Sequence, residues 1–489
     1  MEWSREERYR KIEDITEEEY ENIKQKVKSS PYRQKYHIQP NTGLLNDPNG
    51  FSYFKGKYHL FHQWFPLGPV HGVKYWYHLS SADLVLWEDE GIAMAPDTVY
   101  DSHGVFSGSA LPVKDYLYMF YTGNTRDNNW IRNSYQCIAI MDEKGNITKN
   151  DFPFIDTIPE GYTENFRDPK VFKKNEKYYC LLGAEKENSK GTIVYYSSEN
   201  LSSWKFEGEL KTKFCKNSGF MWECPDYFEI NGEAVLMISP QGMRAEGDLY
   251  KNVFQSGYLL GKKINFKEGN FEHEEFEEFD RGFEFYAPQT MEDPKGRRIL
   301  IGWFGLPGIE SVTDKYGWSH CMTLPRIIEV KNGRLFQKPL PELKNLRKSE
   351  KKFEFNLNNE KIKLDNSRRN YELKVNYKKI RAEKVGIKFR VGKKEETVFY
   401  YDLKNEKLIF NREKSGKLVK NFEGGNIRKC SFNKKELELN IFLDESSVEI
   451  FVNDGLEVFS SRLFNESDSN DIIFFTDGEV RVEGVLWEF

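Results

Sequence analysis

The sequence predicts an all-β protein in which a β-propeller precedes a separate C-terminal β-sandwich, with a short N-terminal helix. Residues 36–335 are a succession of short apolar and aromatic runs interrupted by Gly, Asn, Asp and Pro, which is typical of buried strands joined by turns. A Trp-containing pattern occurs twice within this region, and the composition changes beyond residue 351. The clearest runs predict buried strands at residues 117–121, 178–182, 234–238 and 299–303.

The repeated pattern is S-S-x-[D/N]-L-x-x-W-x-x-x-G, and it occupies residues 80–91 and 197–208. Strand units that repeat with one Trp each favour the blades of a propeller. Sandwiches also repeat strands, so a sandwich is the alternative interpretation of this region.

The chain divides into four segments by this interpretation. Residues 1–32 form an N-terminal helical extension, in which Thr16 and Glu19 have the spacing of a capping box and a helix runs from about residue 17 to 29. Residues 33–338 form the propeller and residues 339–351 a linker with a short helix. Residues 352–489 are rich in Lys and Glu, and their alternating strands predict the sandwich.

Composition excludes several classes of partner. The chain has 489 residues with 72 basic and 77 acidic side chains, a net charge of −5, which gives no reason to expect nucleic acid. No apolar run of about eighteen residues predicts a membrane span, and the N-terminal residues lack the apolar core of a signal peptide. The six cysteines are scattered without metal-binding spacing, which is typical of a reducing compartment. We therefore expect a cytoplasmic protein.

Two aspartates that precede prolines are candidate catalytic groups. Asp47 lies in the sequence Asn-Asp-Pro-Asn-Gly at residues 46–50, which predicts a tight turn before a strand. Asp168 is likewise placed between Arg167 and a proline, where the guanidinium is expected to keep the carboxylate ionised. A rigid carboxylate of this kind suits a nucleophile. Both motifs are also compatible with turns that carry no chemistry.

The third candidate is Glu223, which stands between Trp222 and Cys224. An apolar wall around a carboxyl group disfavours the charged form and suits a general acid at neutral pH. The alternative is a solvent-facing Glu beside a core Trp. In a propeller the innermost strands of different blades converge on the central axis, so the three carboxylates are expected to meet. Two carboxylates that flank a glycosidic bond are the basic apparatus of glycoside hydrolysis.

The same motifs resemble those of glycoside hydrolase family 32, the invertases and fructan hydrolases. The resemblance rests on Asn-Asp-Pro-Asn-Gly at residues 46–50, Phe-Ser-Gly-Ser at 106–109, Arg-Asp-Pro at 167–169 and Glu-Cys-Pro at 223–225. Within the family it is strongest to bacterial intracellular enzymes that act on sucrose 6-phosphate. The resemblance implies a five-bladed propeller with a C-terminal sandwich, and hydrolysis of terminal β-D-fructofuranosides with no metal or other cofactor.

The resemblance also implies a role for individual residues. Asp47 is implied to be the nucleophile, Glu223 the acid/base and Asp168 the stabiliser of the transition state. The implied fructose site is lined by Leu44, Leu45, Asn46, Gln63, His71, Phe106, Ser107, Arg167 and Trp303. Two departures affect the walls of this site. Leu44-Leu45 stand where the family often has Trp-Met, and His71 falls where many members have a Trp.

The expected reaction is a retaining double displacement, which needs the two carboxyl groups about 5–5.5 Å apart, whereas about 6.5–9.5 Å fits an inverting mechanism. Sucrose or its 6-phosphate is the expected small-molecule substrate. Three alternatives remain open: a fructan hydrolase, which the lack of an export signal disfavours, an inverting arabinan-type glycosidase, and a non-catalytic sugar-binding protein.

Substrate phosphorylation and oligomeric state are not determined at this stage. Arg126, Arg132, Arg244 and Lys251 are candidates for reaching a phosphate on the glucosyl group. The C-terminal sandwich either braces the propeller or forms a dimer contact, so a homodimer is one expected state.

Overall fold

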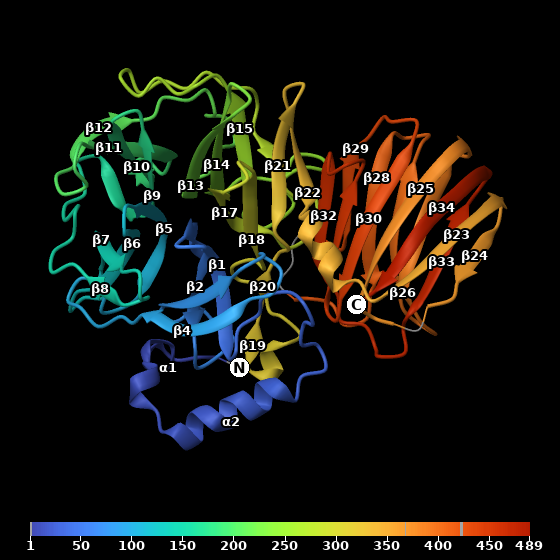
Figure 1. Cartoon of the computed structure of the whole chain (residues 1–489), viewed down its shortest axis with the longest axis horizontal. Helices are drawn as coiled ribbons and strands as arrows, with labels where there is room; N and C mark the ends of the chain where they lie inside the picture. The colour runs from blue at the N-terminus through green and yellow to red at the C-terminus, as the bar shows by residue number, and fades with distance from the viewer. Residues whose placement is uncertain (1, 367, 421–423) are drawn as a thin grey trace.

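In the computed structural model, which describes residues 2–366, 368–420 and 424–489, a five-bladed β-propeller is followed by a β-sandwich. Figure 1 shows the blades grouped on one side of the molecule and the sandwich on the other, with the N-terminal helices below the propeller. The predicted fold class is confirmed. No described helix has the length and apolar content that crossing a bilayer requires.

Each blade is an antiparallel sheet whose first strand lies innermost, as Figure 1 shows. Blade 1 comprises β1 (Gly43–Phe54), β2 (Lys57–Phe65), β3 (Tyr75–Ser81) and β4 (Glu88–Met94). Blade 2 comprises β5 (Val105–Val113), β6 (Tyr116–Arg126), β7 (Arg132–Met141) and β8 (Ile147–Lys149). Blade 3 comprises β9 (Tyr162–Lys174), β10 (Lys177–Lys186), β11 (Gly191–Ser198) and β12 (Lys205–Glu209).

The two remaining blades complete the ring. Blade 4 comprises β13 (Met221–Ile230), β14 (Glu233–Gln241), β15 (Gly257–Gly261) and β16 (Glu277–Glu278). Blade 5 comprises β17 (Tyr286–Glu292), β18 (Arg298–Phe304), β21 (Arg326–Lys331) and β22 (Arg334–Pro339), with β20 (Cys321–Met322) paired to β18. The four runs predicted as buried strands fall within β6, β10, β14 and β18, so these predictions are confirmed.

One irregularity recurs in all five innermost strands. In each blade two residues of the first strand lie opposite a single residue of the second, which is a β-bulge. The extra residue falls between Leu45 and Pro48 in β1, Val105 and Gly108 in β5, Arg167 and Lys170 in β9, Glu223 and Asp226 in β13, and Tyr286 and Gln289 in β17. A bulge bends its strand and redirects the local side chains.

The repeated sequence pattern has the same structure in blades 1 and 3. It covers the end of the third strand and the turn that leads into the fourth. In blade 1 the Trp87 indole donates to the carbonyl of Leu84, which has a φ of 66°, at 3.2 Å. In blade 3 the Trp204 indole donates to the carbonyl of Leu201, with a φ of 64°, at 3.1 Å. The interpretation of the repeat as a blade unit is therefore confirmed.

The ring is closed by a segment that lies between β18 and β21 of blade 5 in the sequence. After η2 (Asp314–Tyr316), β19 (Trp318–Ser319) pairs in parallel with β1, with Gly43 opposite Trp318. This pairing ties blade 5 to blade 1 beside the strand that carries Asp47. The indole of Trp318 is fully buried at this junction.

The N-terminal residues form α1 (Arg5–Tyr9), η1 (Ile12–Asp14) and α2 (Glu17–Lys28). The helix predicted near residues 17–29 is confirmed, and Thr16 caps it by accepting from the Glu19 amide at 3.1 Å. The predicted capping box forms only in part, because the Glu19 carboxylate pairs with Arg10 at 2.6 Å. The α1 helix had no sequence signal that we recognised.

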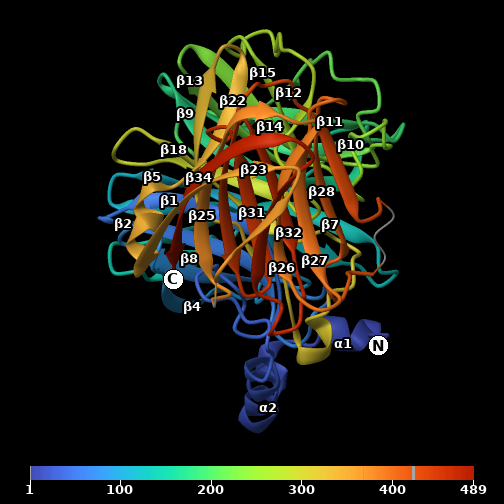
Figure 2. The ribbon, with the colours of Figure 1, turned by 90° about the vertical axis from the view of Figure 1, so that its right-hand side faces the viewer.

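The C-terminal domain is two six-stranded sheets packed face to face, seen toward the viewer in Figure 2. It follows η3 (Pro341–Leu346). One sheet contains β23 (Ser349–Asn358), β34 (Glu479–Glu488), β25 (Tyr371–Arg381), β30 (Leu437–Asp444), β31 (Ser447–Val452) and β32 (Glu457–Arg462). The other contains β24 (Lys361–Leu364), β33 (Asp471–Thr476), β26 (Lys384–Val391), β27 (Glu396–Asp402), β28 (Lys407–Lys414) and β29 (Ile427–Ser431).

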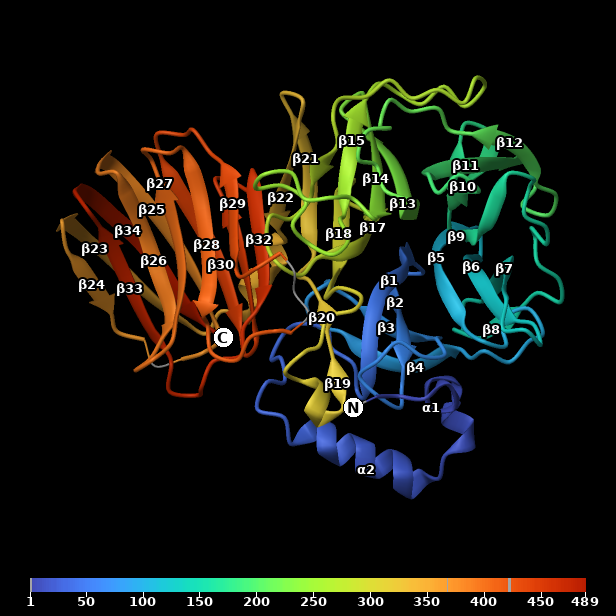
Figure 3. The same ribbon diagram turned by 180° about the vertical axis from the view of Figure 1, so that it is seen from behind.

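A buried ionic network joins the sandwich to blade 5, along the junction that Figure 3 shows from behind. Arg326 donates to Glu449 at 2.6 Å and to Asp280 at 3.1 Å. His37 contacts Asp444 at 2.8 Å through Nδ1 and Glu449 at 3.1 Å through Nε2. All five side chains are fully buried. The two domains thus share a polar core in which each charged group contacts at least one group of opposite charge.

Because both ring nitrogens of His37 face carboxylates, both must carry a proton for the two contacts to be hydrogen bonds. Burial by itself lowers the pKa of His37, but the hydrogen bonds and charges of Asp444 and Glu449 outweigh it and raise the pKa to about 9. The imidazolium is therefore the form that stabilises the domain junction.

We expect this junction to weaken in alkaline solution. A folded-state pKa of about 9 against an ordinary 6.5 makes the His37 contribution complete below pH 6.5 and progressively lost as the pH rises through 9. The difference corresponds to roughly 3 kcal/mol of the free energy of unfolding. Urea unfolding of wild type and His37→Gln between pH 6 and 10 measures it. If the difference in the free energy of unfolding between the two proteins stays constant across this pH range, the raised pKa of His37 is contradicted.

Candidate active site

Asp47 lies within the bulge of β1, not in the predicted turn. Residues 49 and 50 continue the strand, and the hairpin comes later, at Lys55-Gly56, so the turn prediction is wrong. Its carboxylate is half-buried and accepts from the Ser107 hydroxyl at 2.5 Å and from the Asn46 amide at 3.2 Å. Ser107 belongs to the corresponding bulge of blade 2. Two adjacent bulges therefore orient this carboxylate.

The surroundings of Asp47 act on its pKa in opposite directions. Burial raises the pKa of Asp47, and the nearby charge of Glu223 raises it further. The hydrogen bonds from Ser107 and Asn46 oppose this rise, because they favour the ionised form. The net shift is upward.

Asp168 is buried in the bulge of β9, where its backbone has a φ of 67°. The Cys224 amide donates to its Oδ2 at 3.0 Å. Burial raises the pKa of Asp168 to about 7, and the charges of Glu223 and Asp47 add to the rise while Arg167 opposes it. The charge of Arg167 favours the ionised form of Asp168, as predicted, but it does not outweigh burial. The guanidinium is hydrogen-bonded to a different carboxylate.

That carboxylate is Glu223. Arg167 donates to its Oε1 at 2.7 Å, while Gln241 and Tyr286 each donate to its Oε2 at 2.6 Å. The predicted apolar wall is wrong, because Trp222 turns into the hydrophobic core of blades 3 and 4. Polar partners from three blades hold this carboxylate, and the side chain is 15% exposed.

Cys224 links the three carboxylates. Its thiol lies 3.8 Å from Asp47 Oδ2 and 3.6 Å from Asp168 Oδ2, and Glu223 is its neighbour in the chain. Burial raises the pKa of the Cys224 thiol well above its ordinary range, so it stays a neutral thiol between two acids. The structure thus brings Asp47, Asp168 and Glu223 together at one end of the innermost strands.

Asn46 connects the site to a buried cation. Its Nδ2 also donates to Gln63 Oε1, and its Oδ1 accepts from Lys74 Nζ at 2.7 Å. Burial lowers the pKa of Lys74 to about 7, although Asp47 opposes the shift. Lys74 was missed in the sequence, where a lone Lys between Val73 and Tyr75, just before β3, was the available signal.

The structure separates the other expected site residues into two groups. Leu45 and Trp303 pack in one apolar cluster with Cys224 and Tyr286, two residues that contact the carboxylates. Leu44 belongs to a different cluster, with Trp64 and Phe65, and is not brought to the site.

Two further expected residues, His71 and Phe106, lie next to other expected site residues. The His71 ring lies 5.8 Å from the Trp303 ring, and its Nε2 is buried without a hydrogen-bond partner in the described chain. Phe106 precedes Ser107 in the bulge of β5. The Arg132 guanidinium lies 5.6 Å from the centre of the Phe106 ring.

The four basic candidates for a phosphate are dispersed. Arg126 and Arg132 lie on the β6–β7 hairpin, and Arg132 is next to Phe106. Arg244 is exposed in a loop where its backbone bonds to Asn217. The carbonyl of Lys251 faces Arg428 of the sandwich at 3.4 Å.

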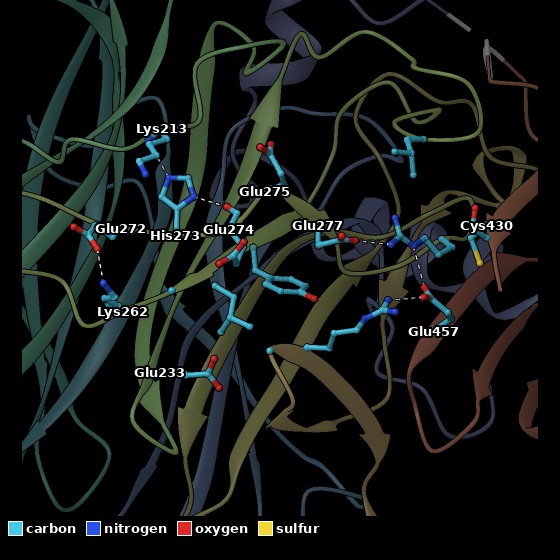
Figure 4. Close-up of a pocket in the computed structure, with 18 of the residues that line it drawn as sticks. Lys213, Glu233, Lys262, Glu272, His273, Glu274, Glu275, Glu277, Cys430 and Glu457 are labelled. Atoms are coloured by element: carbon cyan, nitrogen blue, oxygen red, sulfur yellow. Dashed lines mark hydrogen bonds and ion pairs between the residues drawn. The ribbon is translucent and has the colours of Figure 1, made fainter. Parts of the chain in front are cut away.

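A separate hollow of about 960 Å³ lies between blades 4 and 5 and the sandwich (Figure 4). It contains none of the three carboxylates. Three of the six acidic residues that line it are paired with cations: Lys262 pairs with Glu272, Arg281 with Glu277 and Arg334 with Glu457, each at 2.8 Å. No cluster of three or more His, Cys, Asp or Glu arranged to hold a metal occurs among the residues that the structure describes.

Comparison with known proteins identifies two matching family models. The model of the glycosyl hydrolases family 32 N-terminal domain matches residues 37–339, and that of the family 32 C-terminal domain matches residues 342–488. The sucrose-6-phosphate hydrolase of Staphylococcus xylosus is 43% identical over 96% of this chain and 95% of its own length. That of Bacillus subtilis (strain 168) is 40% identical over 96% of this chain and 97% of its own.

Two solved structures resemble the whole chain. The sucrose-6-phosphate hydrolase of Lactobacillus gasseri superposes with a TM-score of 0.93 at 39% identity, covering 100% of this chain and 99% of that one. A family 32 beta-fructofuranosidase of Bombyx mori superposes with a TM-score of 0.82 at 31% identity, covering 98% and 99%.

We expect Asp168 to titrate near neutral pH and to respond to its neighbour. Replacing Asp47 by Asn removes a negative charge that raises the pKa of Asp168, so its pKa falls in Asp47→Asn. Infrared difference spectra against Asp168→Asn isolate its carboxyl band as the pH is varied. Asp151→Asn, which alters an exposed carboxylate, serves as the control. An unchanged titration in Asp47→Asn would show that the two groups are not coupled.

Proposed function

The chain belongs to glycosyl hydrolase family 32, and we propose that it is a β-fructofuranosidase that cleaves the fructosyl bond of sucrose 6-phosphate and sucrose. The observation that carries the proposal is the meeting of Asp47, Asp168 and Glu223 around one buried thiol. The sucrose-6-phosphate hydrolases that match nearly the full chain support this substrate class.

Asp47 is proposed as the nucleophile that attacks the anomeric carbon of the fructosyl unit. The hydrogen bonds from Ser107 and Asn46 hold the carboxylate in one orientation and favour its ionised form. Lys74 holds the Asn46 side-chain amide in position, because its ammonium group donates to the oxygen of that amide. Lys74 is therefore a positioning residue in this proposal.

Glu223 is proposed as the acid/base. It must carry a proton when the leaving oxygen departs, whereas Arg167 can only donate to it and Gln241 donates through its amide nitrogen. The Tyr286 hydroxyl can both donate and accept. It also lies 3.2 Å from the carbonyl of Ser239, to which it can turn its proton. Tyr286 thus allows Glu223 to change protonation state without a lost hydrogen bond.

Asp168 is proposed to stabilise the transition state. Its ionised form is unfavourable in the free protein, because the group is buried beside two other carboxylates. Positive charge that develops on the fructosyl ring relieves this repulsion. The stabilisation is thus greater in the transition state than in the ground state, which is the condition for catalysis.

The proposed reaction has two steps. Asp47 forms a covalent bond to the anomeric carbon while protonated Glu223 gives its proton to the leaving oxygen. Ionised Glu223 then takes a proton from water, which cleaves the fructosyl–Asp47 ester and releases fructose with retained configuration. Each carboxylate acts from its own blade, so the ring of blades sets their separation.

We further propose that the protein works in the cytoplasm. All six cysteines are unpaired, and five of them are buried, which suits a reducing compartment. A phosphorylated disaccharide carries a fixed charge and is not expected to cross a bilayer unaided.

Replacement of Asp47 by Asn should reduce kcat on sucrose 6-phosphate by at least about 10⁴-fold, because the nucleophile is lost while its shape is retained. Circular dichroism and the thermal midpoint should stay close to wild type. Product analysis by NMR within seconds of mixing should show β-fructofuranose formed first by the wild type. Initial α-fructofuranose, or normal turnover by the variant, would refute the double displacement.

Replacement of Tyr286 by Phe should lower kcat by about 10- to 100-fold, because the protonated Glu223 loses its acceptor. KM should change less than kcat, since the phenol contacts Glu223 and Ser239 rather than the exposed side of the site. Tyr400→Phe, in strand β27 of the C-terminal sandwich, is the matched control. Equal kcat values for Tyr286→Phe and wild type would exclude the proton-switching role.

A further inference from the structure

We propose that Arg126 and Arg132 form an anion site that receives the phosphate of the leaving glucosyl group, and that the N-terminal helix α1 holds this site in place. The inference rests on the proposed function, because it concerns the non-fructosyl half of the same substrate. It assigns the phosphate specificity to one hairpin of blade 2.

The two arginines are placed where their charges repel. Arg126 ends β6, Arg132 begins β7, and they are directly opposite each other in the antiparallel register. Like charges in such a cross-strand pair destabilise a sheet. The carboxylate in the turn between them, Asp127, accepts from the amides of Asn129 and Ile131. The contacts within the hairpin therefore do not explain why two arginines face each other there.

Neither guanidinium has an ion pair with a carboxylate in the described part of the chain, and the Nε atom of each is buried without a hydrogen-bond partner there. The one side-chain hydrogen bond found for either is from Arg132 to Asn165 Oδ1 at 3.0 Å. Burial, together with the charges of Arg167 and Arg126, lowers the pKa of Arg132 to about 10. Unsatisfied buried donors beside uncompensated charge indicate a missing anion.

Asn165 connects this pair to the acid/base. Its Oδ1 accepts from Arg132 at 3.0 Å and from Arg167 at 2.8 Å, and Arg167 holds Glu223 at 2.7 Å. Since Glu223 protonates the oxygen of the leaving group in the proposed reaction, the sugar beyond that oxygen is the leaving glucosyl unit. The arginine pair is thus on the side of the site that this unit occupies.

The N-terminal helix supports the hairpin turn from outside. The guanidinium of Arg5 lies 4.4 Å from the centre of the Trp130 ring, and the Tyr9 ring lies 5.1 Å from it. Trp130 has a φ of 65°, which is costly for a bulky residue and is retained only where packing imposes it. The guanidinium of Arg126 lies 5.9 Å from the centre of the same Trp130 ring. The helix therefore fixes the turn between the two arginines.

The chemistry of the pair fits a phosphate monoester. Planar guanidinium forks match the oxygens of phosphate with two parallel hydrogen bonds, and a dianion compensates two cations. The glucosyl 6-phosphate of the substrate is such a group. Free phosphate and glucose 6-phosphate present the same oxygens, so both serve as probes.

The test compares sucrose 6-phosphate with sucrose for full-length Arg132→Gln, Arg126→Gln and the control Arg381→Gln, an exposed arginine of the sandwich. The kcat/KM for sucrose 6-phosphate should fall about 10- to 100-fold in each of the first two variants, chiefly through KM. The kcat/KM for sucrose should stay within about twofold in Arg126→Gln, and in Arg132→Gln, which also loses the bond to Asn165, it should fall less than the kcat/KM for sucrose 6-phosphate. Arg381→Gln should match wild type on both.

Inhibition supplies an independent measurement. Glucose 6-phosphate should inhibit wild type more strongly than glucose does, and this preference should disappear in Arg132→Gln. Arg132→Lys keeps the charge but loses the planar guanidinium. Its preference for glucose 6-phosphate over glucose as an inhibitor should therefore be intermediate between those of wild type and Arg132→Gln. Inorganic phosphate should compete with sucrose 6-phosphate more weakly in both Gln variants than in wild type.

Equal losses on sucrose and sucrose 6-phosphate would assign these arginines a structural role and overturn the proposal. Unchanged values for sucrose 6-phosphate would overturn it too. If wild type cleaves neither sugar, the proposed function fails. Calorimetric binding of glucose 6-phosphate to wild type and Arg132→Gln then decides the anion site separately, with equal affinities counting against it.

Discussion

The site depends on a β-bulge that recurs at the same level in all five innermost strands. Asp47, Ser107 and Asp168 lie inside three of these bulges, and Glu223 and Tyr286 border the other two. A regular strand would alternate its side chains between the two faces of its blade. The extra residue redirects them, so five separate sheets contribute to one cluster of side chains.

Proline makes this irregularity tolerable. Pro169, Pro225 and Pro288 are within their bulges, and Pro48 follows directly. The bulge leaves an amide without a ladder partner, and proline has no N–H to leave unpaired. The residues before three of these prolines have positive φ, which costs of order 1 kcal/mol or more each. The site is therefore held by a ring of strained positions that neighbouring blades stabilise.

Charge is distributed in the molecule in two different ways. At the domain junction, His37, Arg326 and their three carboxylate partners are buried, and each of these groups contacts at least one group of opposite charge. Such networks specify one arrangement of domains more than they add stability. Around the site the charges are unbalanced: of the three carboxylates only Glu223 has a guanidinium partner, Arg167, in the described chain, and two arginines on the neighbouring hairpin have no carboxylate partner there. Unbalanced charge is useful where a charged substrate and a cationic transition state must be bound.

The sequence by itself determined the all-β class, the position of α2 and the identity of the three acidic residues, because periodic apolar runs and proline-flanked carboxylates are local signals. It did not predict that Asn49-Gly50 continue a strand, that Arg167 bonds to Glu223 instead of Asp168, or that Lys74 supports Asn46. It also could not distinguish among the four candidates for contacting a substrate phosphate, which were Arg126, Arg132, Arg244 and Lys251. Each of these matters depends on contacts between blades that are distant in the chain, and only the closure of the ring brings those partners together.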